Sequence, residues 1–553
     1  MKKVLLKIRY IAVVLCATCA LTSCNDFLGT VPLNEIVLEN FWENEEEVNS
    51  VVMSCYSGMA QGDFLTRLIL WGELRSDNVV AGNITGDIKY VNNDQLMDML
   101  DGSILPNHYI ADWSSFYSVI NRCNTVLHYA PDVVLRDPDF NQSEWNYIEA
   151  EMLTLRALCY YYLVRSFRDV PFVTDPTIDD SRDFKVPAAD PDSVLNVLVK
   201  DLQKAELYAL KEFPEGSSSM YSYTKARVTK LTVWALLADI CLWLERYDDC
   251  IAYCEKVIEA KVEEAKELNM NYDGDYPLIA NQKNSSSTSK HQAYRQTFGT
   301  GFSFESIFEM PFGYNYDDKR DALRSYYGSI DVAIGAMSAS TFLAEGIKEG
   351  NNKIFKESDI RAIESFNTKA SGTFPIHKYV LYSISDDDNT FGYPGFEYSN
   401  WIFYRLTDVM LMEAEALVER NDSAGKKAVD LEKAFELVSA VYTRANLKGE
   451  ELKKKDYPTQ ENMRDLVLLE RQRELLFEGK RWFDLVRKAR REGTSDAMLD
   501  LATQKYTNPG SVKSKWIKPD MLYLPIHEDE LKVNTLLEQN PEYETEKSIT
   551  TAK

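Results

Sequence analysis

Apolar residues recur at intervals of three and four along much of the chain, a spacing that places them on one face of an α-helix. One such run covers residues 144–167 and stops ahead of Pro171 and Pro176, which mark an extended loop. The pattern therefore predicts a mainly α-helical protein. Further helices are expected over 192–210, 225–244, 248–259, 404–420 and 431–447.

Two of these helices are expected to form a hairpin that resembles a tetratricopeptide repeat. Residues 245–247 make the turn, Ala235 and Ala238 allow the helices to approach closely, and Tyr247 wedges the turn. The helices within 404–447 form another pair, but the spacing between pairs is irregular, so no regular array is predicted. The pattern therefore predicts a helical scaffold with tetratricopeptide-like helix pairs and long loop-rich insertions.

Between the helical units the chain is rich in polar and loop-forming residues. Residues 281–290 read NQKNSSSTSK, and strand-like runs such as ESIFEMPF follow before Trp401. Binding residues are expected on such loops, because a rigid scaffold can hold them in place. The predicted organisation is an N-terminal helical region over 24–270 and a C-terminal region over 271–553 that carries the loop-rich insertion.

The charge of the chain narrows the classes of partner. Its 553 residues carry a formal net charge of −24. Binding to nucleic acid needs a basic surface that displaces counterions, and electrostatic binding to anionic lipid needs a basic face, so the composition argues against both. The chain also has 32 Tyr residues, whose flat ring and hydroxyl suit wet recognition surfaces, although most must pack in the core.

The N-terminus has the organisation of a bacterial lipoprotein signal. A basic stretch precedes an apolar run over residues 11–21, which is too short to span a bilayer. The motif LTSC follows and resembles a lipobox, in which small residues let a peptidase cleave before the cysteine. We therefore predict that residues 1–23 are removed and that Cys24 is lipidated, so that acyl chains anchor the protein to a membrane.

The other cysteines and the acidic loops give no metal-ligand pattern, and no cofactor is expected. Cys250 and Cys254 share a helix face, but a zinc site needs more ligands. Calcium is a candidate at SDDDNT (385–390) and near Asp273 and Asp275, yet neither stretch has an EF-hand pattern, so solvated loops are expected. A disulfide stays open, since export leads to an oxidising compartment, although buried thiols are expected at Cys55, Cys123, Cys159, Cys241, Cys250 and Cys254.

The stretch FEGKRWFDL at 477–485 concentrates charged and aromatic residues and raises the question of catalysis. It is expected to join two helices that break at Gly479. A catalytic pair of carboxylates needs a cleft that separates their pKa values, whereas here each charge has a local partner, so we interpret the stretch as structural. The expected pairs are Glu470 with Arg473, Glu478 with Arg481, and Asp484 with Lys480 or Arg487.

Four motifs occur in order along the chain: LTSCNDFL, EAEMLTLRALCYYYLVRSFRDVPFV, ERQRELLFEGKRWFDLVRK and YLPIHEDELKVNTLLEQNPEY. Together they resemble the SusD/RagB family of outer-membrane nutrient-binding lipoproteins of Bacteroidetes, over nearly the whole chain. The resemblance implies a SusD-like helical scaffold, anchored by lipid to the outer membrane and facing the cell surface. It implies that the protein caps a SusC-like TonB-dependent β-barrel transporter, binds an oligosaccharide or, in some members, a peptide, and is not an enzyme.

Two alternatives to oligosaccharide capture remain. One is a peptide-capturing RagB-like subunit, which needs backbone hydrogen bonding in an enclosed cavity rather than aromatic faces with polar rims. The other is a surface-anchored hydrolase. The chain lacks the G-x-S-x-G, H-E-x-x-H and P-loop motifs, and its five His residues show no ligand spacing.

The resemblance places ligand-binding residues in loops that correspond here to residues 75–109 and 294–327. On an extended segment Tyr314 and Tyr316 share a face, so a sugar ring would stack on them while polar groups of the first loop bond its hydroxyls. The alternative is that the Tyr residues pack on the scaffold. The predicted ligand-binding residues are Arg75, Asp77, Asn78, Tyr90, Tyr314, Tyr316, Tyr326 and Tyr327.

Overall fold

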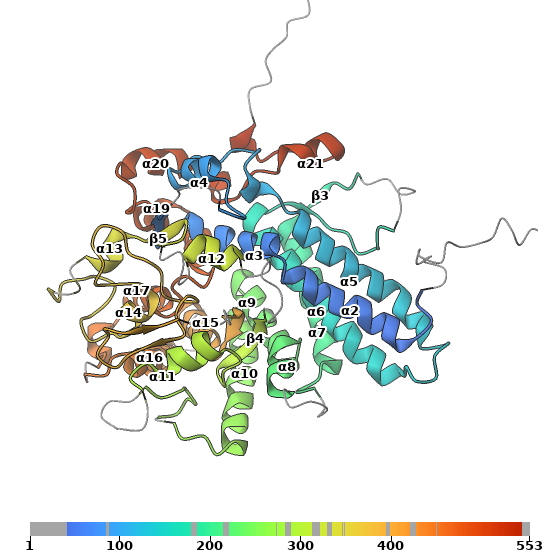
Figure 1. Cartoon of the computed structure of the whole chain (residues 1–553), viewed down its shortest axis with the longest axis horizontal. Helices are drawn as coiled ribbons and strands as arrows, with labels where there is room; N and C mark the ends of the chain where they lie inside the picture. Colours follow the sequence, from blue (N-terminus) through green and yellow to red (C-terminus); the bar gives the residue numbers. More distant parts are fainter. Residues whose placement is uncertain are drawn as a thin grey trace, which may run out of the picture.

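Helices make up 58% of the structure, a computed structural model, which confirms the mainly α-helical prediction. They pack as layers of neighbouring helices, with loops and short strands gathered on one side (Figure 1). The structure describes residues 41–83, 88–178, 185–213, 220–272, 274–281, 289–311, 321–328, 334–345, 347, 349–393, 399–420, 427–448 and 451–544.

The N-terminal part is a row of long helices in which each packs on the next one along the chain. Helix α6 runs through the middle of this row, and every residue from 150 to 167 is buried. Asn141 caps its first turn together with Glu144, so the helix begins close to the predicted position and ends as predicted at Phe167. The helices of this row are α2 (Glu45–Met59), α5 (Ser114–Val133), α6 (Gln142–Phe167), α7 (Pro191–Tyr208), α9 (Lys230–Trp243) and α10 (Tyr247–Glu267).

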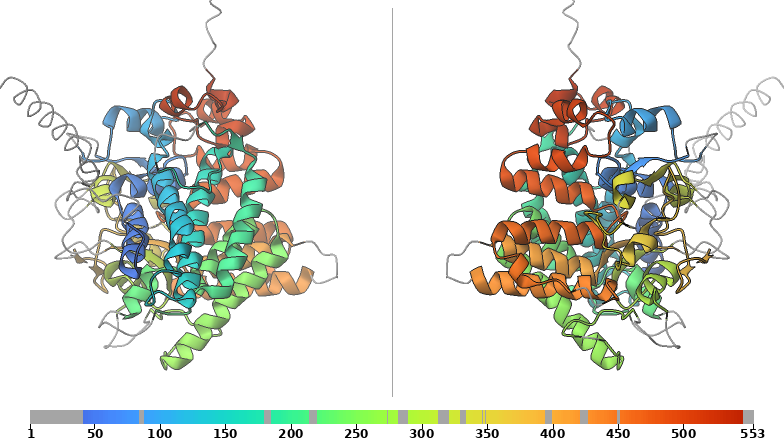
Figure 2. Two further views of the ribbon diagram at one scale, coloured as in Figure 1. Left: turned by 90° about the vertical axis from the view of Figure 1, so that its right-hand side faces the viewer. Right: turned by 90° about the vertical axis from the view of Figure 1, so that its left-hand side faces the viewer.

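Helices α9 and α10 pack together as the predicted hairpin, and Ala235 and Ala238 of α9 are buried. The prediction of one helix over 225–244 is wrong, because the chain breaks between α8 (Met220–Ala226) and α9. Thr229 has extended backbone angles, and its side chain and that of Thr232 cap the new helix reciprocally. A local capping box therefore overrides the apolar pattern. Helix α10 also continues beyond the predicted end and projects from the lower edge of the molecule (Figure 2).

The C-terminal part adds a second stack of helices (Figure 2). Helix α15 links the two stacks, because it packs on α10 as well as on α16 and α17. Within the described residues, no helix is both long enough and apolar enough to cross a membrane. The helices of this stack are α15 (Leu406–Glu419), α16 (Lys427–Ala445), α17 (Gln460–Glu474), α18 (Arg481–Glu492), α19 (Asp496–Ala502), α20 (Pro509–Trp516) and α21 (Glu528–Val533).

The loop-rich insertion contains short helices and antiparallel strand pairs. The predicted strand-like run ESIFEMPF forms β4 (Ser306–Met310), which pairs with β8 (Trp401–Arg405) ahead of α15.

The other strand pairs of the described chain are β1 (Val79–Ala81) with β5 (Met337–Ala339), β2 (Val170–Pro171) with β3 (Ala188–Ala189), and β6 (Ser383–Ile384) with β7 (Phe391–Gly392). The remaining short helices are α3 (Gly62–Ile69), η3 (Leu70–Leu74), α4 (Asn93–Leu100), η4 (Tyr109–Ala111), α11 (Gln292–Tyr294), η5 (Arg295–Thr300), α12 (Asp321–Tyr327), α13 (Thr341–Ala344), α14 (Arg361–Ser365), η6 (Lys454–Asp456), η7 (Pro519–Leu522) and η8 (Pro541–Tyr543).

The six cysteines of the folded part confirm the expectation of buried thiols. Each is free, and burial raises the pKa of Cys159 and Cys254 well above the usual value of a thiol. Such thiols stay protonated and behave as small apolar side chains. They are Cys55, Cys123, Cys159, Cys241, Cys250 and Cys254.

Candidate functional site

The two segments expected to hold the ligand lie side by side. Strand β1, from the first segment, pairs with β5, which follows the second, and the Ser340 N–H donates to the Asn78 carbonyl at 2.8 Å. Helices α3 and α12 pack against each other beside this strand pair (Figure 1). The fold therefore brings regions far apart in sequence to one junction.

Three tyrosines form a hydrogen-bonded group at this junction, which we call the tyrosine cluster: Tyr90, Tyr109 and Tyr326. The Tyr326 hydroxyl donates to the Tyr90 carbonyl oxygen at 2.8 Å and lies 2.9 Å from the Tyr109 hydroxyl. Tyr326 is buried, whereas Tyr90 and Tyr109 are half-buried and keep part of their surface open. Burial raises the pKa of Tyr109 to about 12, so its hydroxyl is protonated at neutral pH. The cluster thus combines aromatic surface with hydroxyl groups, as sugar recognition requires.

The backbone of Tyr90 is held in an uncommon conformation. Its φ is 64°, in the left-handed region, which costs a non-glycine residue roughly 1–3 kcal/mol. The ring lies directly over Gly62, where an added Cβ would come within 2.3 Å of the ring atom Cζ. This packing and the bond from Tyr326 fix Tyr90, so its ring is positioned before any ligand arrives.

Four of the other predicted residues point into the protein. The Arg75 guanidinium carbon lies 4.2 Å from the centre of the Trp482 ring, and the Asp77 carboxylate binds Arg481 with 2.8 Å contacts. These contacts pack the N-terminal region against α18. A role in ligand binding stays a prediction for the four residues, whose side chains are buried: Arg75, Asp77, Asn78 and Tyr327.

Three predicted residues lie outside the described part of the chain: Cys24, Tyr314 and Tyr316. Their roles stay predictions. Tyr314 and Tyr316 belong to residues 312–320, which directly precede α12 in the sequence. They are therefore close in sequence to Tyr326 of the tyrosine cluster.

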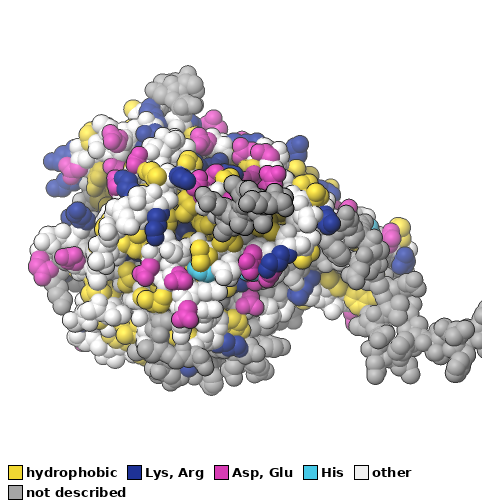
Figure 3. Space-filling view, turned by 90° about the horizontal axis from the view of Figure 1, so that it is seen from above, with side chains coloured by type: hydrophobic (Ala, Val, Ile, Leu, Met, Phe, Trp, Pro, Cys, Tyr) yellow, Lys and Arg dark blue, Asp and Glu magenta, His cyan; other side chains and the backbone are white. Residues whose placement is uncertain are grey.

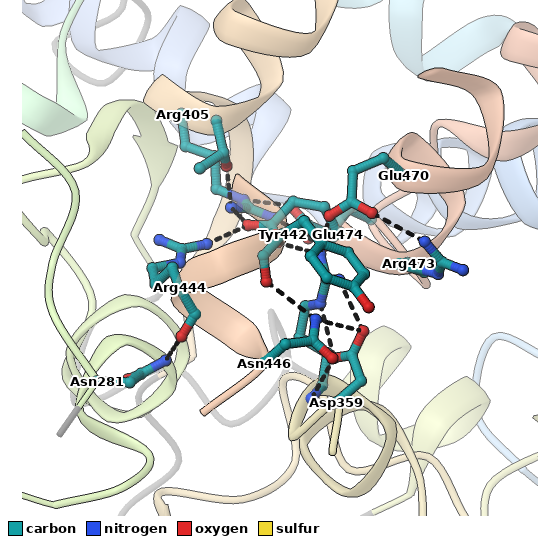
Figure 4. Close-up of polar contacts among 12 residues, drawn as sticks. Asn281, Asp359, Arg405, Tyr442, Arg444, Asn446, Glu470, Arg473 and Glu474 are labelled. Atoms are coloured by element: carbon teal, nitrogen blue, oxygen red, sulfur yellow. Dashed lines mark hydrogen bonds and ion pairs between the residues drawn. The ribbon is translucent and has the colours of Figure 1, made fainter. Parts of the chain in front are cut away.

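A buried network of charges surrounds Glu474 at the end of α17, ahead of the RWFDL motif at 481–485 (Figure 4). The Glu474 carboxylate accepts hydrogen bonds from Arg405 at 2.7 Å, from Arg361 at 3.0 Å and from Arg444. Burial opposes ionisation, but the guanidinium groups of Arg444, Arg405 and Arg361 hold the pKa of Glu474 well below its usual value. The arginines come from α16, β8 and α14, so the network joins the insertion to the helical stack.

Two of the predicted local pairs are confirmed. Arg473 lies 3.1 Å from Glu470, and Arg487 lies 2.7 Å from Asp484. The predicted break is confirmed as well, because α17 ends at Glu474 and α18 begins at Arg481, with Gly479 at a φ of 70° between them.

The predicted pair of Glu478 with Arg481 is wrong. Glu478 binds Lys378 at 2.9 Å and Arg405 at 2.7 Å, while Arg481 binds Asp77. The reason is the break between the helices. Glu478 lies between α17 and α18, whereas Arg481 begins α18, so the helical i, i+3 geometry does not apply to this pair. Distant segments provide the partners instead, which supports the structural interpretation of the motif.

The acidic stretch at 385–390 is paired with basic side chains from elsewhere in the chain. The Asp388 carboxylate binds Lys290 Nζ at 2.6 Å and His291 Nε2 at 2.8 Å. Among the described residues, no group of three or more His, Cys, Asp or Glu side chains is arranged to hold a metal ion. Asp273 lies outside the described residues, whereas Asp275 borders the second cavity named below.

Two of the cavities among the described residues are large and open. One of about 920 Å³ lies between α13, α17 and α19, and its lining includes Asp77 and Gln472. Another of about 450 Å³ lies between residues 274–281 and α16. The larger one has the size of a small-molecule site, which is typically about 300–1,000 Å³. The sequence analysis did not predict this site, although Asp465, Leu468, Leu469 and Gln472 of α17 have the spacing of one helix face.

The surface agrees with the acidic composition. Among the coloured side chains of the face in Figure 3, Lys and Arg are scattered between Asp and Glu and form no broad basic area. Such a face does not favour binding to nucleic acid.

The fold and the site define a binding protein: a helical scaffold that presents loops, cavities and half-buried tyrosines. The model of the SusD family matches residues 260–543, and a model described as "Starch-binding associating with outer membrane" matches residues 26–242. The chain therefore belongs to the SusD/RagB family, a family of glycan-binding proteins associated with the outer membrane. Proteins of this family are binding proteins without catalytic activity, so the prediction that the chain is not an enzyme is confirmed.

Individual relatives agree over nearly the whole chain. Two SusD-like proteins of Formosa agariphila are 25% and 24% identical over 542 and 493 residues, which cover 93% and 84% of this chain and 95% and 88% of theirs. A SusD superfamily protein from Bacteroides vulgatus superposes with a TM-score of 0.65 at 19% identity, covering 91% of this chain and 100% of the other. A structure described as a laminarin-binding SusD-like protein superposes with a TM-score of 0.60 at 22% identity, covering 90% and 99%. These likenesses confirm the SusD-like fold.

Proposed function

We propose that the protein is a lipoprotein of the cell surface that captures an oligosaccharide and passes it to a SusC-like TonB-dependent transporter. Membership of a glycan-binding family supports the ligand class. The observation that carries the site is the junction of the two predicted segments, where half-buried Tyr90 and Tyr109 are held through Tyr326. Tyr314 and Tyr316 are proposed to extend the aromatic surface of this site.

The ligand is tested by a glycan array followed by calorimetry on the purified protein. Laminarin and starch oligosaccharides come first, because two of the matches carry these glycans in their descriptions. The variant Tyr90→Ala/Tyr109→Ala should bind the retained glycan about tenfold or more weakly, since it removes two aromatic faces that contact the sugar.

The matched control is Tyr208→Ala, because Tyr208 is 44% exposed on α7, away from the junction. It should bind as the wild type does. Unchanged affinity in a folded Tyr90→Ala/Tyr109→Ala variant would place the site elsewhere. Binding of peptides from a casein digest, with no glycan bound, would favour the peptide-capturing function instead.

The anchor is proposed to be acyl chains on Cys24, which follows an apolar run and a lipobox-like motif. Two or more chains give stable attachment, because each buried methylene contributes about 0.8 kcal/mol. Cells that express Cys24→Ala should release the protein from the membrane fraction and lose its label from a radioactive fatty acid. A Cys24→Ala protein that still carries label and sediments with membranes would contradict the assignment.

A further inference from the structure

We propose that the cavity of about 920 Å³ between α13, α17 and α19 is a second carbohydrate site, separate from the tyrosine cluster, which takes uncharged oligosaccharides and rejects acidic ones. The inference rests on the proposed function for its ligand class. The three helices lie on the same side of the molecule (Figure 1). We call this cavity the α17 groove.

One wall of the α17 groove is a single face of α17. Asp465, Leu468, Leu469 and Gln472 follow the spacing i, i+3, i+4 and i+7, so their side chains point the same way. The two leucines are half-buried and make an apolar strip, and the polar residues stand at its two ends. An apolar strip between hydrogen-bonding groups matches a sugar ring, which has an apolar C–H face and hydroxyl groups at its edge.

The opposite wall is held rigidly by Asn352. Its Nδ2 donates to the carbonyl oxygens of Phe342 and Leu343 at 3.2 and 3.1 Å, and its Oδ1 accepts from the Ile354 and Phe355 N–H groups at 2.8 and 2.7 Å. The turn over residues 352–355 is therefore tied to α13. A wall fixed before binding reduces the entropy lost when a ligand is ordered.

The inner end of the groove is lined by Gln472, whose side-chain carbonyl oxygen can accept a hydrogen bond from a ligand. Gln472 is 3% exposed, and its Nε2 donates to Asp77 at 3.1 Å and to Asn78 at 2.9 Å. Among the described residues, none donates to its Oε1, although the side chain lines the groove. A sugar hydroxyl in the groove would donate a hydrogen bond to this oxygen.

The charge of the groove selects the kind of glycan. Glu345, Glu349 and Asp465 line it without an ion pair among the described residues, whereas the Arg481 charge is already neutralised by Asp77. Lys353 is the further cation in the lining. Carboxylates accept hydrogen bonds from hydroxyl groups but repel uronate and sulfate groups. The groove therefore suits uncharged sugars.

Recognition here must use side chains, which favours a glycan over an extended peptide. An extended peptide gains much of its affinity by pairing with a free strand edge. The neighbouring strand β5 pairs with β1 on one side, and Ala339 bridges Phe374 on the other. The lining comes from helices and turns instead.

The test compares three purified proteins on an array of uncharged glycans, polygalacturonate and alginate oligosaccharides, and casein peptides, followed by calorimetry with the strongest uncharged glycan. The groove variant is Asp465→Ala/Gln504→Ala, in which both altered residues are exposed. The control is Glu461→Ala, an exposed acid on the same helix outside the groove. We expect two sites in the wild type and the control, and a loss of about tenfold or more in affinity at one site in the groove variant.

The outcomes separate the two proposals. If the wild type binds an uncharged glycan and the groove variant binds it identically, the second site is refuted while the proposed function stands. A preference for acidic glycans that the groove variant abolishes also refutes the stated selectivity. Peptide binding that the variant abolishes assigns the groove to peptides and refutes this inference. If no glycan binds to the wild type, the proposed function and the second site fall together.

Discussion

Replacing Glu474 by Gln tests whether the RWFDL region serves the fold. The substitution keeps the shape of the side chain and removes its negative charge. It leaves the guanidinium groups of Arg361, Arg405 and Arg444 without this partner in a buried environment. An uncompensated buried charge is strongly destabilising, because it has lost its hydration and gained no counter-charge.

The expected cost follows from the contacts. Breaking a buried ion pair by removing one partner typically costs about 3–5 kcal/mol. Other carboxylates stay close, since Arg361 keeps Asp359 at 2.7 Å and Arg405 keeps Glu478 at 2.7 Å. We therefore expect a loss at the lower end, about 3 kcal/mol, in the free energy of unfolding.

The assay is urea unfolding followed by far-UV circular dichroism, with Glu461→Gln on the exposed side of α17 as the control. The control should change stability by less than about 0.5 kcal/mol. Because the pKa of Glu474 lies below its usual 4.5, its stabilisation is present above that pH and is lost as the pH falls through the lower folded value. The difference between wild type and Glu474→Gln should therefore be constant near neutral pH and shrink in acid. A stable Glu474→Gln protein that lost only ligand binding would refute the structural interpretation.

Two other substitutions probe the packing. Gly72→Ala should destabilise the fold by roughly 1–3 kcal/mol in urea unfolding, because its Cβ would lie 2.1 Å from the Gly479 carbonyl oxygen; wild-type stability would contradict this close approach. Burial opposes protonation of His291, but hydrogen bonds to Asp388 and Glu364 raise its pKa from 6.5 to about 9. Protonated His291 thus stabilises the fold fully below pH 6.5, and this stabilisation, at most about 3 kcal/mol, is lost as the pH rises to about 9. His291→Gln should flatten this part of the profile of unfolding free energy against pH. Identical profiles for wild type and variant would refute the ion pair.

Much of the scaffold could be predicted because its signals are local. The apolar spacing over 144–167 and the small residues at Ala235 and Ala238 each act within one helix or one hairpin. The start of α9 after Thr229 also has a local signal, because a capping box can be read from the sequence. The apolar pattern outweighed this signal, so the prediction joined α8 and α9 into one helix. The partners of Glu478 were not predictable in the same way. Lys378 and Arg405 lie far from it in the sequence, and only the folded insertion brings them together.

The candidate site shows the same limit. The family resemblance pointed to two segments that the fold brings together through β1 and β5, but it did not separate inward from outward side chains. Tyr326 and Tyr327 are adjacent on α12 and both are buried, one holding Tyr90 and the other bonding the Phe477 carbonyl oxygen. Tyr109 was not singled out, because nothing in its sequence neighbourhood shows that Tyr326 lies beside it.

The buried charge network explains how a loop-rich insertion can present a binding surface. Long loops lose considerable conformational entropy when they are ordered, and exposed contacts alone hold them weakly. Here Arg361 and Lys378 of the insertion reach Glu474 and Glu478 beside α17 with contacts of 3.0 and 2.9 Å. Because a buried ion pair tolerates few alternative partners, it fixes one arrangement of the loops on the scaffold even where its net contribution to stability is small. The RWFDL region thus has a structural role: it holds in place the insertion from which Tyr326 and the α13 wall of the α17 groove arise.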